Sequence, residues 1–185
     1  MMFRFLIFFF ILNFYNPVFS SIKEKIISQM LLTNNLSFNF IQTIGNKSEN
    51  GKCVIKYPKK IWCKYNNFNK KIIVSNGKSL VIKTANNNNN YRYSLSKTPL
   101  IFLLDKRYLI SKIKMLEPRE IDNKFINFEI LENNNKINIF FDKKNLNLIG
   151  WQTEDIYRNP VITLISSVKI NQKINEKIFI LPLNN

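Results

Sequence analysis

The pattern that most constrains the fold is a long succession of short apolar segments in which apolar and polar side chains alternate. Leu36, Phe38 and Phe40, for example, alternate with Ser37 and Asn39. A period of two places the apolar side chains on one face of a β-strand. Strands are therefore predicted at residues 36–44, 52–57, 61–66, 71–75, 79–84, 91–95, 109–116, 125–132, 136–142, 145–153, 161–170 and 177–181.

The connections between these segments contain residues that are typical of tight turns. Asn76 and Gly77 separate two apolar runs, which is the strongest local signal for a β-hairpin. Further reversals are predicted at 132–136 and 142–145, and Gly45 and Gly51 are expected to bracket a polar turn. An antiparallel sheet of about eleven short strands would expose long edges if it were flat, so a barrel or a strongly curved sheet is predicted.

Two segments have the character of helices. In "SIKEKIISQMLL", residues 21–32, Ile22, Ile26 and Met30 lie at helical spacing. The segment "KTPLIFLL", residues 97–104, begins with Thr98 and Pro99, which favour a helix start. We expect this short, very apolar helix to be either a plug in the core or a movable lid.

The N-terminus has the form of a secretory signal peptide. Arg4 precedes an apolar run from Phe5 to Leu12, and Val18-Phe19-Ser20 provides a cleavage pattern after Ser20. About eight apolar residues are far fewer than the roughly twenty that span a bilayer. We predict that residues 1–20 are removed and that residues 21–185 form a single domain outside the cytoplasm.

The chain is strongly basic, with 28 lysines and arginines against 12 acidic residues and a net charge of +16. A surplus of lysine that reflects compositional bias would be spread over the surface, whereas a functional surplus attracts anionic lipid or nucleic acid. Because the signal peptide predicts export from the cytoplasm, lipid is the favoured partner. We therefore expect contact with an anionic membrane surface and none with nucleic acid.

Several kinds of chemistry are excluded by composition. The chain has no histidine, which removes Ser-His-Asp and Cys-His nucleophilic sites and histidine-ligated metal centres. Its four glycines fit neither phosphate-loop nor dinucleotide-binding patterns. Acidic pairs such as Glu154 and Asp155, or Glu117 and Glu120, have the character of solvated surface. The sequence predicts a non-enzymatic protein without metal or cofactor that binds something apolar.

The two cysteines, Cys53 and Cys63, are ten positions apart. Two thiols without histidine do not complete a zinc site, and a redox pair would have Cys-x-x-Cys spacing. An oxidising compartment favours a disulfide. This bridge requires a hairpin with an odd-length loop centred on Pro58, with Ile55 opposite Ile61.

The order of motifs resembles the LolA family of periplasmic lipoprotein carriers. After the N-terminal helix come "FNFIQTIG" (38–45), Gly51 at the start of a strand, "YPKKIWCKY" (57–65) and "IIVSNGKSL" (72–80). The Thr-Pro helix start at 97–104 and "EKIFILP" (176–182) complete the similarity, which covers most of the chain. One departure is Tyr57, which stands where the family has an arginine that is thought to tie the lid shut. We expect the Tyr57 hydroxyl to bond a lid carbonyl instead.

The resemblance implies a half-open antiparallel barrel with helices over its mouth and a cavity for lipoprotein acyl chains. It also implies a periplasmic, monomeric carrier that is loaded by an inner-membrane ABC-type exporter and unloaded at an outer-membrane acceptor. Strand alternation and the apolar helix together predict the following cavity lining: Phe38, Phe40, Ile55, Tyr57, Ile61, Tyr65, Leu100, Leu103 and Leu104. The alternative for each of these residues is that it packs in the core and contacts no ligand.

Two other functions remain open at the level of sequence. A LolA-like envelope protein can bind lipid or act as a sensor without carrying cargo. A structural envelope protein would expose its apolar face instead of enclosing it.

Overall fold

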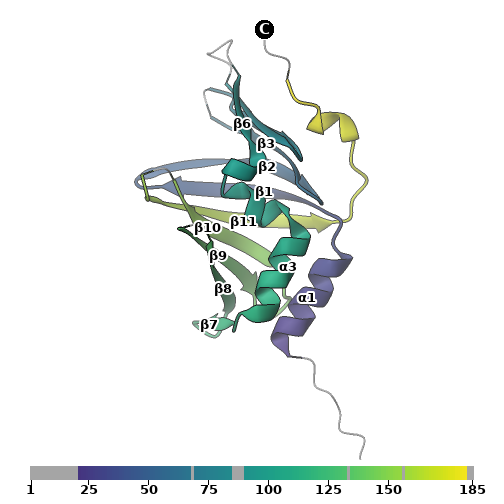
Figure 1. Ribbon diagram of the computed structural model, residues 1–185, viewed down its shortest axis with the longest axis vertical. Helices are drawn as coiled ribbons and strands as arrows, with labels where there is room; N and C mark the ends of the chain where they lie inside the picture. Colours follow the sequence, from purple (N-terminus) through teal and green to yellow (C-terminus); the bar gives the residue numbers. More distant parts are fainter. Residues whose placement is uncertain (1–20, 68, 85–89, 133, 156, 183–185) are drawn as a thin grey trace, which may run out of the picture.

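The computed structural model describes residues 21–67, 69–84, 90–132, 134–155 and 157–182 (Figure 1). The predicted signal peptide, residues 1–20, lies outside these ranges.

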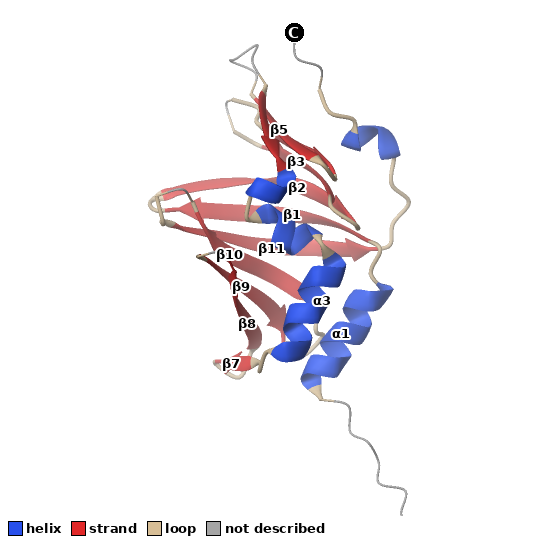
Figure 2. Cartoon of the chain, viewed as in Figure 1, coloured by secondary structure: helices blue, strands red, loops and turns tan. Residues whose placement is uncertain are grey.

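A single curved, fully antiparallel sheet forms the body of the protein, and its α-helices lie against one of the two faces (Figure 2). Its order is β6-β5-β4-β3-β2-β1-β11-β10-β9-β8-β7, so β6 and β7 are two separate edges and the sheet is open. The eleven strands are β1 (Asn35–Ile44), β2 (Lys47–Lys56), β3 (Lys60–Tyr65), β4 (Ile72–Asn76), β5 (Ser79–Lys83), β6 (Tyr91–Ser94), β7 (Arg119–Ile121), β8 (Phe125–Glu132), β9 (Asn135–Asp142), β10 (Leu148–Glu154) and β11 (Pro160–Ile170). The predicted mainly β class and strongly curved sheet are confirmed.

The helical elements are α1 (Ile22–Leu32), η1 (Leu95–Lys97), α2 (Leu100–Leu104), α3 (Lys106–Met115) and η2 (Glu176–Phe179). Ser21 caps α1, because its hydroxyl accepts the Glu24 amide while the Glu24 carboxylate accepts the Ser21 amide. In the described ranges, no helix is both long and apolar enough to cross a membrane.

The main core lies between the concave face of the sheet and the helices. Phe128, Ile137 and Ile139 are fully buried in it, together with Ile26 of α1 and Ile113 of α3. Helices α1 and α3 lie side by side across β8–β10, whereas α2 lies nearer to β1–β5 (Figure 1). The helices therefore cover one part of the concave face fully and another part only with the short α2.

The prediction of a strand at 109–116 is wrong, because these residues belong to α3. Leu109, Ile110 and Ile113 are buried on one side of this helix, a spacing that also satisfies much of a period-two pattern. Asp105 caps the helix by accepting the Tyr108 amide. The apolar pattern is compatible with both a strand and a helix, and the Asp105 cap is the feature that distinguishes the helix.

The predicted strand at 177–181 is also wrong, since η2 occupies residues 176–179. Asn175 begins this turn by accepting the Lys177 amide. Phe179 is buried, and η2 packs against β3 and β4 on the side of the sheet away from the helices. The C-terminal segment therefore makes a small second core on the outer face, together with buried Val74 and Val81.

Strand β2 begins at Lys47 and runs through Gly51, so the expected turn bounded by Gly45 and Gly51 is reduced to the two residues Gly45 and Asn46. The three-residue strand β7 was not predicted. The Asn76-Gly77 hairpin is confirmed, with the Asn76 side chain accepting the amides of Lys78 and Ser79.

Candidate functional site

A cavity of about 260 Å³ opens between the concave face of the sheet and α2. It is lined by side chains of α2 and of strands from both halves of the sheet: Phe40, Gln42, Cys53, Ile61, Cys63, Tyr65, Lys71, Ile73, Ile82, Thr98, Pro99, Leu100, Leu103, Trp151, Thr153, Glu154 and Thr163. Most of this surface is apolar. Ligand pockets usually measure roughly 300–1,000 Å³, so this cavity is slightly smaller than the usual range.

Five of the nine predicted lining residues meet at this cavity, namely Phe40, Ile61, Tyr65, Leu100 and Leu103. Phe40 and Tyr65 form an edge-to-face pair with ring centroids 4.8 Å apart. These residues come from two strands, β1 and β3, and from α2, and the antiparallel pairing of both strands with β2 brings the strand residues together.

The other four predicted residues lie elsewhere. Phe38, Ile55 and Leu104 are buried in the main core, and Phe38 packs edge-on against Trp151 with centroids 6.1 Å apart. Tyr57 lines a second, smaller cavity of about 40 Å³ near the C-terminal end of α1.

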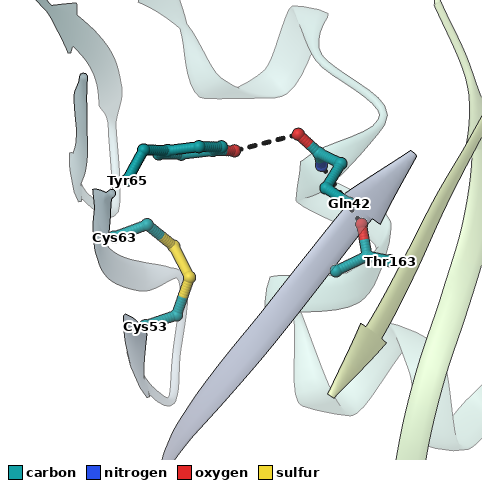
Figure 3. The surroundings of a disulfide bond; sticks show 5 residues. All are labelled: Gln42, Cys53, Cys63, Tyr65 and Thr163. Carbon is teal, nitrogen blue, oxygen red and sulfur yellow. Dashed lines mark hydrogen bonds between the residues drawn. A yellow bond between two sulfur atoms is a disulfide. The ribbon is translucent and has the colours of Figure 1, made fainter. Parts of the chain in front are cut away.

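The disulfide between Cys53 and Cys63 is present and forms part of the cavity wall (Figure 3). Cys53 pairs with Cys63 and Ile55 with Ile61 across β2 and β3, and residues 57–59 form the odd-length loop. The Cα atoms of the two cysteines are 4.1 Å apart. The predicted bridge and register are both confirmed.

A polar chain of side chains crosses one part of the cavity (Figure 3). The Tyr65 hydroxyl donates to Gln42 Oε1 at 3.0 Å, and Gln42 Nε2 donates to Thr163 Oγ1 at 3.1 Å. Burial, and then the nearby Glu49 carboxylate, raise the pKa of Tyr65, so its hydroxyl stays protonated and remains a donor. Lys71 lies 3.8 Å from the centroid of the Tyr65 ring and pairs with Glu49. The cavity is therefore amphiphilic.

Helix α2 is tied to the β2–β3 hairpin through Lys59. The Lys59 amide donates to the Leu104 carbonyl at 2.9 Å, and Lys59 Nζ pairs with Asp105 Oδ2 at 3.0 Å. Partial burial would raise the pKa of Asp105, but hydrogen bonds from Lys59 and from the Tyr108 amide, with the charges of Lys59 and Arg107, lower it overall. The Asp105 carboxylate is therefore ionised at neutral pH.

The expected bond from the Tyr57 hydroxyl to a lid carbonyl is absent, since within the described ranges this hydroxyl has no hydrogen-bond partner. Burial raises the pKa of Tyr57 to about 12, and Lys106 Nζ lies 5.7 Å from its ring centroid. Lys59, two residues further along the same turn, makes the contact with the end of α2 instead.

The lining residues that were missed from the sequence include Gln42, Trp151 and Thr163. Gln42 follows Phe38 and Phe40 at the same period of two, so the alternation of β1 already placed it on the inner face. Trp151 and Thr163 required the pairing of β1 with β11 and of β11 with β10, which joins residues more than one hundred positions apart. No local pattern contains that pairing.

Comparison with known proteins identifies the family. The family model described as "Outer membrane lipoprotein carrier protein LolA" matches residues 32–181. A search of curated protein sequences finds no significant match. The family assignment therefore depends on a match that spans the whole sheet.

Similar solved structures include a LolA superfamily protein from Nitrosomonas europaea, with 10% identity, a TM-score of 0.49 and coverage of 88% of this chain and 99% of that one. A putative outer membrane lipoprotein-sorting protein domain from Vibrio parahaemolyticus has 8% identity and a TM-score of 0.45, with coverage of 84% and 94%. The MucA/MucB complex of Pseudomonas aeruginosa contains a chain with 6% identity and a TM-score of 0.38, and coverage of 86% and 60%. The family match over residues 32–181 decides the assignment: this chain belongs to the LolA family of outer membrane lipoprotein carrier proteins.

Proposed function

We propose that this protein is a periplasmic carrier that holds the acyl chains of lipoproteins in the cavity under α2 while it moves them from the inner to the outer membrane. The observation that carries this proposal is the amphiphilic cavity itself. Its apolar wall, which includes Phe40, Ile61 and Leu103, suits an acyl chain, while Tyr65, Gln42 and Thr163 offer hydrogen bonds to a polar head.

The size of the cavity agrees with a carrier that must also release its cargo. Each buried methylene contributes about 0.8 kcal/mol, so a full acyl chain in a deep pocket would dissociate very slowly. A cavity of about 260 Å³ encloses only part of a diacyl group. Loading therefore requires α2 to move outward, which breaks the contacts of Lys59 with Leu104 and Asp105.

In this proposal an inner-membrane ABC-type exporter loads the carrier and an outer-membrane acceptor receives the cargo. The carrier has no catalytic role of its own, and the exporter supplies the energy of loading. The protein acts as a monomer, because one chain contains the complete cavity.

A direct test uses the two tryptophans, which lie on opposite faces of the sheet. In a Trp62→Phe variant, the remaining Trp151 lines the cavity and reports on its contents. Titration with a diacylated lipopeptide should change Trp151 fluorescence with saturation. Leu103→Asp should abolish this change, because it places a charge in the apolar wall.

The matched control is Leu131→Asp, since Leu131 is 70% exposed on β8 and does not line the cavity. This variant should bind the lipopeptide normally. An unchanged titration with Leu103→Asp, or an equal loss with both variants, would contradict binding in this cavity.

The transport step is tested separately with inner-membrane spheroplasts that contain the exporter. Added protein should release lipoproteins into the medium, and the Leu103→Asp variant should not. Lipopeptide binding without any release would favour a lipid-binding or sensor protein over a carrier.

A further inference from the structure

Charge is divided unevenly between the two halves of the sheet. In β11 and β1–β6, Glu49 is the one acidic residue, and it faces the cavity side, where it pairs with Lys71. The basic residues of the same strands are Lys47, Lys52, Lys56, Lys60, Lys64, Lys83, Arg92 and Lys169. In β7–β10 the balance is reversed, with Glu120, Glu129, Glu132, Asp142 and Glu154 against Arg119 and Lys136. Among the strand residues, the basic surplus therefore lies on one half of the sheet.

On the outer face of this half, lysines stand directly opposite each other. Lys52 pairs in register with Lys64, and Lys56 with Lys60. Glu176 of η2 forms ion pairs with Lys56 and Lys60, which neutralises that pair in part. Like charges opposite each other on neighbouring strands are destabilising. The Lys52–Lys64 pair has no acidic counterion among the described residues, so its position calls for a functional explanation.

In β11, β1, β2 and β3, three lysines of this outer face have no acidic partner among the described residues: Lys52, Lys64 and Lys169. Lys52 and Lys169 line a groove of about 360 Å³, and half-buried Trp62 forms part of its wall. Further along the same face, Ile41 of β1 lies opposite Leu164 of β11, and each is 54% exposed. The basic groove thus continues into an exposed aliphatic area.

We propose that this outer face of β11, β1, β2 and β3 docks on an anionic phospholipid surface. Lys52, Lys64 and Lys169 lie against lipid phosphates, and Trp62 lies at the level of the head groups, a position that tryptophan favours. Ile41 and Leu164 are shielded from water at the same interface, as apolar side chains are in proteins that lie on membranes. A nucleic acid would satisfy the lysines but would leave these two aliphatic side chains without a partner.

The geometry also leaves the cavity free. Phe40 and Tyr65 line the cavity from the inner face of β1 and β3, whereas the docking face is formed by the intervening residues of the same strands. A protein attached through its outer face therefore keeps α2 and the cavity turned away from that contact. The inference goes beyond the carrier proposal and does not depend on it.

Binding is tested by sedimentation with vesicles of phosphatidylcholine that contain about one third phosphatidylglycerol. A triple variant with Lys52→Gln, Lys64→Gln and Lys169→Gln should bind about a hundredfold more weakly, because three lysines act near the surface. The matched control removes the same charge at exposed Lys114, Lys124 and Lys144, which lie on α3 and in loops next to the acidic half of the sheet. An equal loss of binding in both variants would show a nonspecific charge effect and overturn the assignment of this face.

The position of the contact is tested with a Trp151→Phe variant, in which Trp62 is the one remaining tryptophan. Its emission should shift to shorter wavelength with the anionic vesicles and stay unchanged with pure phosphatidylcholine. Absence of the shift during measurable binding would place the contact elsewhere. If the protein does not bind the vesicles but binds duplex DNA through the same three lysines, the choice of lipid is overturned.

The two proposals fail independently. Lipopeptide titration of the Trp62→Phe variant should be the same with and without the three lysine substitutions, since they lie on the opposite face from the cavity. Urea unfolding of each variant shows whether a loss of binding reflects a loss of folding.

Discussion

Gly51 lies inside β2 at a place that has no room for a side chain. A Cβ atom there would lie 2.2 Å from the Lys64 carbonyl oxygen and 2.8 Å from the Phe40 ring. The backbone atom belongs to the β2–β3 ladder and cannot move aside without loss of pairing. The glycine therefore lets the Phe40 ring lie close to β2 and contact Tyr65 in the cavity wall.

We expect Gly51→Ala to lower the free energy of unfolding by about 1–3 kcal/mol, the usual cost of overpacking a filled site. Urea denaturation measures this change. Asn50→Ala, at the neighbouring exposed position, is the control and should have little effect. Equal stability of the two variants would show that β2 moves away from β3 at no cost.

Asp105 has two separable roles, as cap of α3 and as partner of Lys59. Asp105→Asn keeps a good capping side chain and removes the charge. We expect a loss of at most about 1 kcal/mol, because both side chains of the ion pair are partly exposed to solvent. Glu117→Gln, which removes a more exposed ion pair with Lys23, is the control in the same urea experiment.

The pH dependence follows from the lowered pKa of Asp105. A carboxyl group with a lower pKa in the folded than in the unfolded state adds stability that is complete above the unfolded value, and this stability is lost as the pH falls through the folded value. The Asp105→Asn variant should therefore show a smaller loss of stability between about pH 5 and the acid limit than the wild type. Parallel curves for both proteins would contradict a role for this ionisation.

At the scale of elements, the β2–β3 hairpin is held by both its ladder and its disulfide. Cys53 and Cys63 are ten positions apart, and closing a loop of this size stabilises the folded state by at most about 3 kcal/mol. We expect the double variant Cys53→Ala and Cys63→Ala to lose up to this amount in urea denaturation. The wild type treated with dithiothreitol should behave in the same way, and an unchanged midpoint for both would show that the ladder alone fixes the hairpin.

The C-terminal segment is a structural element although it adds no strand. Phe179 is 3% exposed, whereas its neighbour Ile180 is 69% exposed. Phe179→Ala should lower the free energy of unfolding by about 3 kcal/mol or more, because it empties a buried site over Val74 and Val81. Ile180→Ala is the matched control, and similar effects of the two changes would mean that η2 contributes little packing.

Local patterns in the sequence predicted most elements but not all of them. Strands with clear alternation and turn residues, such as β1 and the β4–β5 hairpin, were predicted to within a few residues. Residues 109–116 satisfied two periodicities at once, and the decision came from the Asp105 cap and from contact with α1. The fold of η2 likewise depends on the distant strands β3 and β4, which its sequence does not contain.

At the scale of the whole molecule, the sheet sorts charges that look scattered along the sequence. Composition alone left open whether the surplus of lysine is spread evenly or gathered into a patch. Strand order answers this question for the strand residues, because β11 pairs with β1 and joins Lys169 to the lysines of β2 and β3. The cavity lining follows the same rule: residues of β1, β3 and α2 were predicted, and the residues contributed by β10 and β11 were not.

The open sheet has a consequence for the range of cargo. In a closed barrel the circumference is fixed by the number of strands and their stagger, so a bulkier guest must break a hydrogen-bonded ladder. Here β6 and β7 are free ends of one continuous ladder, and the curvature between them can relax while every strand keeps its neighbours. The bending of the sheet thus sets the width of the cavity, and cargo with acyl chains of different thickness can be accommodated by bending without local unfolding.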